Sequence, residues 1–350
     1  MRARRALVIG LVGVIAIVGA LGLGQVFARG GKLAAMLPDP CPIQLFKDML
    51  TPGVHAISMA SPTSGWVVGE EGIIFHYTNG AWRHECSPSK RDLNAIVAIS
   101  PNEAWTVGDW GTILHYRDGA WTQVASPTDF PLAGLAMVSR DEGWATAGGD
   151  SGLLLHYHNG VWTRVQTHLY ASFSDITMRS PTDGWAIGQE VSPLPKSGQP
   201  PKSVVLHYTN GIWTRVPSAP NLDMEGISFV SSTEAWVAEG NGLSAMHYTD
   251  GQWAPLSPSR DYTGTALRPG SLSCVRMLSA NEGWASGRFG ELLHYTGGQW
   301  NVIPAPVQSD IDKLAPLSAH EVWAVAQFSV LHYDGAHWTS TPLNLPRSSP

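Results

Sequence analysis

One unit of sequence recurs seven times, and this repetition constrains the fold more than any other feature of the chain. Each unit begins with a short apolar stretch, reaches a tryptophan, continues to a His-Tyr pair and ends at a second tryptophan. The first tryptophans are Trp66, Trp105, Trp144, Trp185, Trp236, Trp284 and Trp323. The histidines are His76, His115, His156, His207, His247, His294 and His332. The second tryptophans are Trp82, Trp121, Trp162, Trp213, Trp253, Trp300 and Trp338, which leaves Trp110 outside the repeat.

Four short apolar runs lie in each unit, separated by turn residues, and such runs predict β-strands. In the first unit the runs, which we name strands a to d, read AISM, GWVVG, IIFHY and AWRHE. Strands c and d are joined by dipeptides such as Asn79-Gly80 that favour tight antiparallel hairpins. A period of about 40 residues with four strands is typical of a propeller blade. We therefore predict an all-β fold, a seven-bladed β-propeller with four antiparallel strands per blade, over residues 54–342.

The spacings within the repeat separate two faces of this ring. From the apolar anchor of strand a, such as Ile57, to the first tryptophan is nine residues in every unit, and from the histidine to the second tryptophan is six. All length variation falls in the b–c and d–a connections, including insertions within residues 186–206 and 254–274. In an up-and-down sheet these two connections emerge on one side, which we call the variable face; the a–b and c–d side is the fixed face. Loop variation of this kind is typical of a binding surface.

Residues 1–28 are predicted to direct the protein to a membrane. Three arginines precede the uncharged stretch from Ala6 to Gly24, which at about 1.5 Å per residue nearly spans a hydrocarbon core of about 30 Å. Either this segment is an uncleaved transmembrane helix with the propeller on the extracytoplasmic side, or it is a cleaved signal peptide and the protein is secreted. Residues 29–53 would then be a linker, and residues 343–350 a C-terminal tail.

The charge of the chain bears on which partners it can bind, and its cysteine content bears on the compartment in which it folds. Residues 1–32 contain five cationic side chains and no acidic ones. The rest of the chain, with 17 cationic and 28 acidic side chains, is therefore negatively charged and unsuited to binding nucleic acid. Of the three cysteines, Cys41 and Cys86 form the most plausible disulfide pair, since an oxidising compartment permits one.

The repeats resemble those of the photosystem II stability and assembly factor family of propellers, within the wider Asp-box (BNR, sialidase-type) superfamily. The stretches that carry the resemblance are GWVVGEEGIIFHYTNGAWRHECSP and AWTVGDWGTILHYRDGAWTQVASP. An Asp box normally reads Ser-x-Asp-x-Gly-x-Thr-Trp, whereas these units read Tyr-x-Asn/Asp-Gly-x-Trp. The resemblance implies that strand a is innermost and that the protein is a non-catalytic scaffold.

Residues that depart from the repeat are the candidates for contacting a protein or glycan partner on the variable face. They are the aromatic residues Trp110, Tyr262 and Phe289, and the arginines Arg268 and Arg276. Arg276 stands in strand a where the other units have small residues, so it either lines the central channel or forms a salt bridge within blade 6. The alternative function is a sialidase-like glycoside hydrolase, which needs arginines to bind a carboxylate and a tyrosine nucleophile. The candidates for these roles are Arg91, Arg260, Arg268, Arg288, Tyr170 and Tyr262.

The remaining expectations concern structure. The repeated histidines lie on separate blades and cannot converge on a metal, so we predict structural roles, with each imidazole bonded to backbone of a neighbouring blade. The repeated tryptophans should fill the space between blades. We predict no catalytic residues, metal or cofactor, and a monomer. All strands of the first and last units are present in order, so blades 1 and 7 should meet without strand exchange, through side-chain packing alone.

Overall fold

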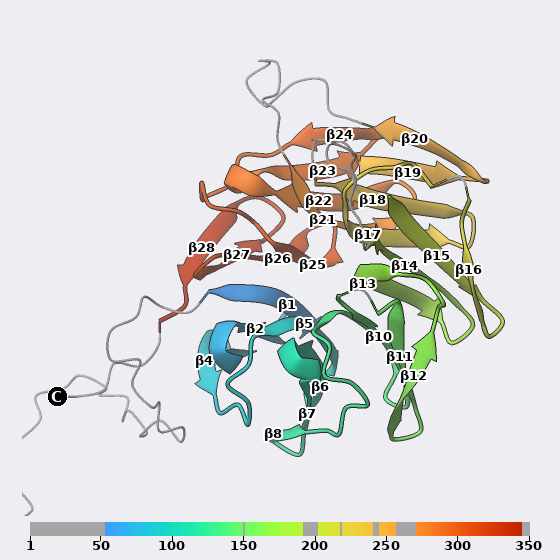
Figure 1. The fold of residues 1–350 in the computed structure, drawn as a ribbon. Helices are drawn as coiled ribbons and strands as arrows, with labels where there is room; N and C mark the ends of the chain where they lie inside the picture. The colour runs from blue at the N-terminus through green and yellow to red at the C-terminus, as the bar shows by residue number, and fades with distance from the viewer. Residues whose placement is uncertain are drawn as a thin grey trace, which may run out of the picture. The chain divides into compact units, whose positions relative to one another are not determined.

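The computed structural model describes residues 53–149, 151–191, 202–217, 219–240, 245–256 and 271–344. In this part of the chain seven four-stranded antiparallel sheets are present, and in each of them the strands follow chain order (Figure 1). The predicted seven-bladed propeller is thereby confirmed. Blade 1 contains β1 (Val54–Ser61), β2 (Ser64–Gly69), β3 (Ile74–Thr78) and β4 (Ala81–Glu85).

The other six blades repeat this plan. Blade 2 contains β5 (Leu93–Ser100), β6 (Glu103–Gly108), β7 (Ile113–Arg117) and β8 (Ala120–Gln123). Blade 3 contains β9 (Leu132–Ser139), β10 (Glu142–Ala147), β11 (Leu153–His158) and β12 (Val161–Gln166). Blade 4 contains β13 (Ala171–Ser180), β14 (Asp183–Glu190), β15 (Ser203–Thr209) and β16 (Ile212–Arg215). Blade 5 contains β17 (Met224–Ser231), β18 (Glu234–Glu239), β19 (Ala245–Thr249) and β20 (Gln252–Leu256). Blade 6 contains β21 (Leu272–Ser279), β22 (Glu282–Gly287), β23 (Leu292–Thr296) and β24 (Gln299–Val302). Blade 7 contains β25 (Lys313–Ser318), β26 (Glu321–Ala326), β27 (Ser329–Tyr333) and β28 (Trp338–Pro342).

The first strand of every blade lines the centre of the ring. Each first strand contacts the first strand of the next blade, and β25 contacts β1 to close the circle (Figure 1). The innermost position of strand a, which the sequence implied only by resemblance, is therefore confirmed. Antiparallel chain order also places the b–c and d–a connections on one face and the a–b and c–d connections on the other.

A seam of aromatic side chains joins neighbouring blades. Each first tryptophan is at most 3% exposed and stacks on the histidine of its own blade, at ring-centroid distances of 3.8–4.3 Å. Its other side packs against the His-Tyr tyrosine of the following blade. At the closing boundary Trp323 of blade 7 lies 4.8 Å from Tyr77 and 6.0 Å from Trp82 of blade 1. The tryptophans thus fill the space between blades, as predicted.

The partner of the repeated histidine differs from the prediction. In each blade the imidazole bonds a carboxylate of its own blade, not backbone of a neighbour. In six blades this carboxylate precedes the first tryptophan by two residues, as Glu234 does for His247 at 2.9 Å. Blade 1 has Ser64 there, and Glu85 of β4 bonds His76 at 2.7 Å instead. A charged acceptor gives a stronger hydrogen bond than a backbone carbonyl, which explains the preference.

Ring closure follows the prediction in one respect and departs from it in another. Blades 1 and 7 are each complete in chain order, so no strand is exchanged among the described residues. A core cluster with Val54, Phe75 and Trp323 spans the boundary. The boundary is nevertheless not made by side chains alone, because the Val54 amide donates a hydrogen bond of 2.8 Å to the Gln327 carbonyl.

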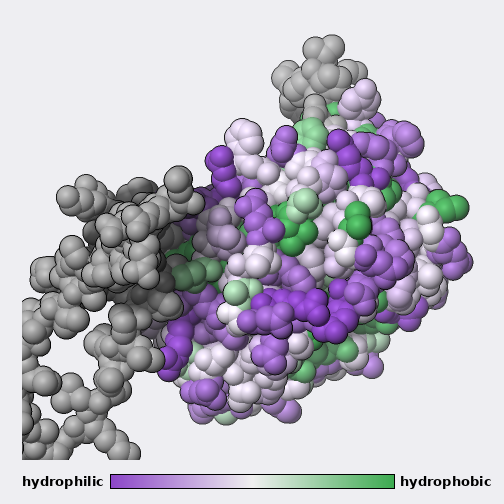
Figure 2. All heavy atoms as spheres, turned by 90° about the horizontal axis from the view of Figure 1, so that it is seen from below, coloured by the Kyte–Doolittle hydropathy of each residue, from purple (hydrophilic) through white to green (hydrophobic). Residues whose placement is uncertain are grey.

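Residues 1–52 lie outside the described part of the chain, and with them the predicted anchor, most of the linker and Cys41. Within the described residues no helix has the length and apolar character of a membrane span. Cys274 is free and buried. On the side of the ring seen in Figure 2, hydrophobic residues are scattered in small groups among hydrophilic ones.

Candidate binding site

A cavity of about 360 Å³ occupies the centre of the ring. Its walls are residues of the first strands of blades 1, 2, 3, 4, 6 and 7, among them Ser58, Val97, Ala136 and Thr177. Most of these side chains are small or apolar, because the inner strands converge and leave little room. The charged residues Asp175, Arg276 and Lys313 interrupt this lining.

Arg276 lines the cavity and also forms a salt bridge, but not within blade 6. Its guanidinium lies 3.5 Å from the Asp175 carboxylate of blade 4 and donates to the Ile227 carbonyl of blade 5 at 3.2 Å. Asp175 is 5% exposed and accepts further hydrogen bonds from the backbone amides of Ile176 and Ile227. The pair therefore ties three blades together across the channel wall. Because both charges are already paired, we assign Arg276 a structural role before a binding one.

A second cavity, of about 610 Å³, opens on the variable face between blades 7, 1 and 2. We call it the mouth pocket. It shares the lining residues Asn94 and Lys313 with the central cavity, so the two cavities are adjacent. Its charged and titratable lining residues are His55, Glu70, Asp310, Asp312 and Lys313.

Burial makes the acidic groups at this end of the channel hard to ionise. The pKa of Asp312 is raised to about 6, chiefly by burial and further by the charge of Asp310, while His55 and Lys313 oppose the rise. The pKa of Glu291 is raised to about 7 by burial and by Asp310, against a hydrogen bond from the Ser271 amide. Burial and the charge of Asp223 also raise the pKa of Glu225. A cationic group placed here would favour ionisation of these carboxyls.

The b–c turns of blades 1, 2 and 6 share one backbone form, a short 3₁₀ turn bounded by glycines. These turns are η1 (Glu70–Gly72), η2 (Asp109–Gly111) and η3 (Arg288–Gly290). Their middle residues, Glu71, Trp110 and Phe289, have φ of 53°, 57° and 57°. Such a left-handed backbone is uncommon for large side chains. Trp110 is 65% exposed and Phe289 is 74% exposed, so both stand in solvent on the variable face.

Neighbouring side chains hold these aromatic turns in place. The Phe289 amide donates to the Asp310 carboxylate at 2.9 Å, which connects the turn to the mouth pocket. The guanidinium of Arg91 lies 5.1 Å from the Trp110 ring centroid, within the range of a cation–π contact. Trp110 therefore stands on blade 2, which contributes Asn94 to the mouth pocket, and Phe289 stands on a turn of blade 6 that is bonded to Asp310 of the pocket.

The other predicted site residues are not brought together. Tyr262 and Arg268 lie outside the described residues, as does Arg260. Among the described residues Arg276 is the one arginine that lines either cavity, and it is paired. Arg91 stacks on Trp110, and Tyr170 is exposed on a d–a loop. The described part of the chain therefore shows no pocket with several arginines and a tyrosine–carboxylate pair.

Further candidate site residues, which the sequence analysis did not single out, lie at the variable-face ends of the inner strands. In blades 1 to 6 a β-bulge lies two residues before the anchor of strand a, for example at His55, Asn94 and Glu225. Asp312 takes the same sequence position in blade 7. Six of the seven repeats have a polar residue at this position, and Ala133 of blade 3 is the exception.

No protein-family model and no curated protein matches the sequence. Solved structures do match the fold: a structure described as YCF48 bound to D1 peptide superposes with a TM-score of 0.63 at 19% identity, over 81% of this chain and 93% of that one. The chain shares its fold with YCF48. YCF48 from Cyanidioschyzon merolae gives a TM-score of 0.58 at 16% identity, over 82% of this chain and 97% of that one.

The likeness to YCF48 confirms, at the level of fold, the resemblance to photosystem II assembly-factor propellers seen in the repeats. It is a likeness of architecture, since other propellers are equally similar. The WD40 propeller domain of Doa1 has a TM-score of 0.63 at 10% identity, over 83% of this chain and 94% of that one.

Proposed function

We propose that this protein is a non-catalytic binding or assembly scaffold that captures a segment of a protein partner on its variable face, over the mouth pocket. The observation that carries the proposal is the exposure of Trp110 and Phe289 on turns of the variable face, one of which is bonded to Asp310 of this pocket. Large aromatic side chains exposed to solvent are typical anchors of protein interfaces.

The charge of the site favours a partner segment that combines cationic and apolar side chains. Glu70, Asp310 and Asp312 line the mouth pocket, while Lys313 is its one lysine or arginine among the described residues. A lysine or arginine of the partner entering the pocket would pair with these carboxyls, among them Asp312, whose ionisation burial now opposes. Aromatic anchors around such a pocket would contact the apolar residues on either side. The YCF48 structure with D1 peptide supports this mode, because a propeller of this fold is there described as bound to a peptide.

We further propose that residues 6–24 tether the propeller to a membrane, with the ring on the extracytoplasmic side. The apolar length and the preceding arginines support this orientation. Full-length protein should stay in the pellet when membranes are washed with carbonate. A soluble form that begins near Arg29 would show a cleaved signal peptide instead.

The binding proposal is tested by capture from membranes with the tethered protein as bait and with two pairs of variants. Trp110→Ala and Phe289→Ala should each weaken partner capture by about 1–2 kcal/mol, without changing the melting temperature. Ile212→Ala and Val161→Ala are matched controls, because these side chains are 65% and 59% exposed but follow the c–d turns of the fixed face. Loss of capture in the controls, with retention in the first pair, would place the partner on the opposite face.

A further inference from the structure

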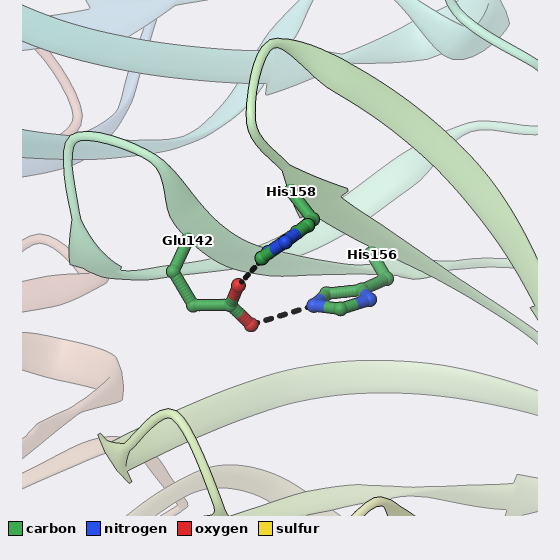
Figure 3. A group of neighbouring side chains, drawn as sticks. All are labelled: Glu142, His156 and His158. Atoms are coloured by element: carbon green, nitrogen blue, oxygen red, sulfur yellow. Dashed lines mark hydrogen bonds and ion pairs between the residues drawn. The ribbon is translucent and has the colours of Figure 1, made fainter.

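Blade 3 holds a cluster of three metal-binding side chains on adjacent strands (Figure 3). Glu142 comes from β10, and His156 and His158 come from β11. The Glu142 carboxylate lies between the two imidazoles, with one oxygen 2.6 Å from His156 Nε2 and the other 2.8 Å from His158 Nδ1. The three donor atoms lie within 4.8 Å of one another.

The third member of this cluster is particular to blade 3. Glu142 and His156 belong to the carboxylate–imidazole pair that recurs in the blades, whereas His158 replaces the residue that follows the His-Tyr pair. The equivalent residues elsewhere are Thr78, Arg117, Thr209, Thr249, Thr296 and Asp334. The carboxylate oxygen that does not bond the repeated histidine also has a different partner in blade 3. In blade 2 this oxygen of Glu103 bonds Arg140, and in blade 4 this oxygen of Asp183 bonds Arg179. In blade 3 this oxygen faces a second imidazole.

We propose that Glu142, His156 and His158 bind a divalent transition-metal ion, with Zn²⁺ as the best-suited ion. Two imidazole nitrogens and one carboxylate oxygen are a ligand set that Zn²⁺ accepts, at distances of about 2.0–2.2 Å. Three protein ligands leave a coordination position for water or a further ligand. Residues His156 and His158 are two apart on one strand, so their side chains share a side of the sheet, and Glu142 is the direct cross-strand neighbour of His158.

Two of the ligands are already held in place. The His156 ring stacks on Trp144 at 4.1 Å, and the Glu142 side chain is only 13% exposed. His158 is 63% exposed, so its side chain can move to lengthen its own hydrogen bond to metal–ligand spacing. The 2.6 Å contact between His156 Nε2 and Glu142 must lengthen as well, by a shift of the Glu142 carboxylate. His156 and Glu142 are therefore partly positioned before an ion binds, and the exposed side of the cluster at His158 lets an ion enter from solvent.

Metal binding requires a change of hydrogen bonding that the surroundings allow. At present the Asn159 amide nitrogen lies 2.8 Å from His158 Nε2, so Nε2 accepts and Nδ1 donates to Glu142. For Nδ1 to offer its lone pair to a metal, the ring proton must move to Nε2. Asn159 can then turn its amide, so that its oxygen accepts from Nε2. His156, whose Nε2 now donates to Glu142, must likewise carry its proton on Nδ1 to free Nε2 for the metal.

The test is calorimetric titration of the full-length chain, prepared without a polyhistidine tag, with ZnCl₂. We expect one Zn²⁺ per chain. His158→Thr, which restores the residue of four other blades, and Glu142→Gln should each weaken Zn²⁺ binding by at least about tenfold. His337→Thr is the control, because this exposed histidine lies in the c–d turn of blade 7, away from the cluster. It should leave binding unchanged.

A second readout separates metal binding from damage to the fold. His158→Thr should melt at the wild-type temperature without Zn²⁺ and should lose the increase in melting temperature that Zn²⁺ gives the wild type. Electron paramagnetic resonance of the Cu²⁺-loaded protein should show coupling to two imidazole nitrogens in the wild type and to one in His158→Thr. Unchanged Zn²⁺ affinity in His158→Thr, or no stoichiometric binding to the wild type, would overturn the proposal.

Discussion

Glu291 lies at the end of the b–c turn of blade 6, where a single backbone amide compensates its burial. With its pKa raised from 4.5 to about 7, the folded protein binds more protons at this group than the unfolded chain between these pH values. The free energy of unfolding should therefore fall as the pH rises from about 4.5 to about 7. Asp312, with its pKa raised to about 6, contributes in the same direction.

Glu291→Gln tests this dependence, because glutamine can still accept the hydrogen bond from the Ser271 amide but cannot ionise. Denaturant unfolding at pH 5, 6 and 7 should show a smaller loss of stability with pH in the variant than in the wild type. His115, whose pKa is lowered mainly by burial, changes stability in the opposite direction in both proteins and cancels in the difference. Parallel stability profiles for the two proteins would show that Glu291 titrates normally.

At the level of elements, the glycine that ends each aromatic turn is what allows the turn to form. Gly111 has φ of +65°, and a Cβ built there would lie 1.8 Å from the Thr128 carbonyl oxygen. The close approach of the d–a backbone therefore admits no side chain. Gly119, in the c–d hairpin of the same blade, has φ of +83° but open space around it.

Gly111→Ala and Gly119→Ala form a matched pair that separates these two effects. Gly119→Ala should lower the free energy of unfolding by about 1 kcal/mol, from backbone strain alone. Gly111→Ala should cost a further 1–3 kcal/mol or so, because the Thr128 backbone must move, and it should also weaken partner capture through Trp110. Urea unfolding of both variants measures the difference. Equal losses of unfolding free energy in the two variants would mean that the Thr128 backbone moves aside without an energetic cost.

How far the sequence predicts these elements depends on the range of the interactions. The spacing from Ile57 to Trp66 is set by hydrogen bonds between adjacent strands, so periodicity alone identifies the blade. In six blades the acidic partner of the histidine stands two residues before the first tryptophan, as Glu142 does, so the aligned repeats contain this pairing. In blade 1 the partner is Glu85 of the last strand, which the repeat does not predict. The contact of Arg276 with Asp175 joins residues 101 positions apart, and no local pattern reports it.

At the scale of the whole molecule, the boundary between blades 7 and 1 is where the ring is closed without a covalent connection between neighbouring blades. At the other boundaries a d–a segment links the blades through the chain. The closing boundary relies on the packing of Trp323 against Tyr77 and Trp82, on the surrounding core cluster and on the hydrogen bond from Val54. We expect local opening of the ring to begin there.

Trp323→Ala tests this expectation by native-state hydrogen exchange. Loss of the buried ring should cost about 3–5 kcal/mol and speed amide exchange most in β1 and β25–β28. Trp236→Ala, at the boundary between blades 5 and 6, serves as the comparison and should speed exchange in β17–β24 without opening the closure. Uniform acceleration around the ring in both variants would indicate that the propeller opens as a single cooperative unit.

Because two complete blades meet at this boundary, the propeller fold does not require the chain to start at blade 1. Gly53 precedes β1, Leu343 follows β28, and the Leu343 amide bonds the Phe328 carbonyl beside the residue that accepts from Val54. Both ends of the propeller are therefore anchored at neighbouring positions of blade 7. A short peptide joining them would allow new termini to be cut into a d–a loop such as residues 124–131. The architecture thus lends itself to circular permutation, by which the two ends of the chain could be moved to another blade.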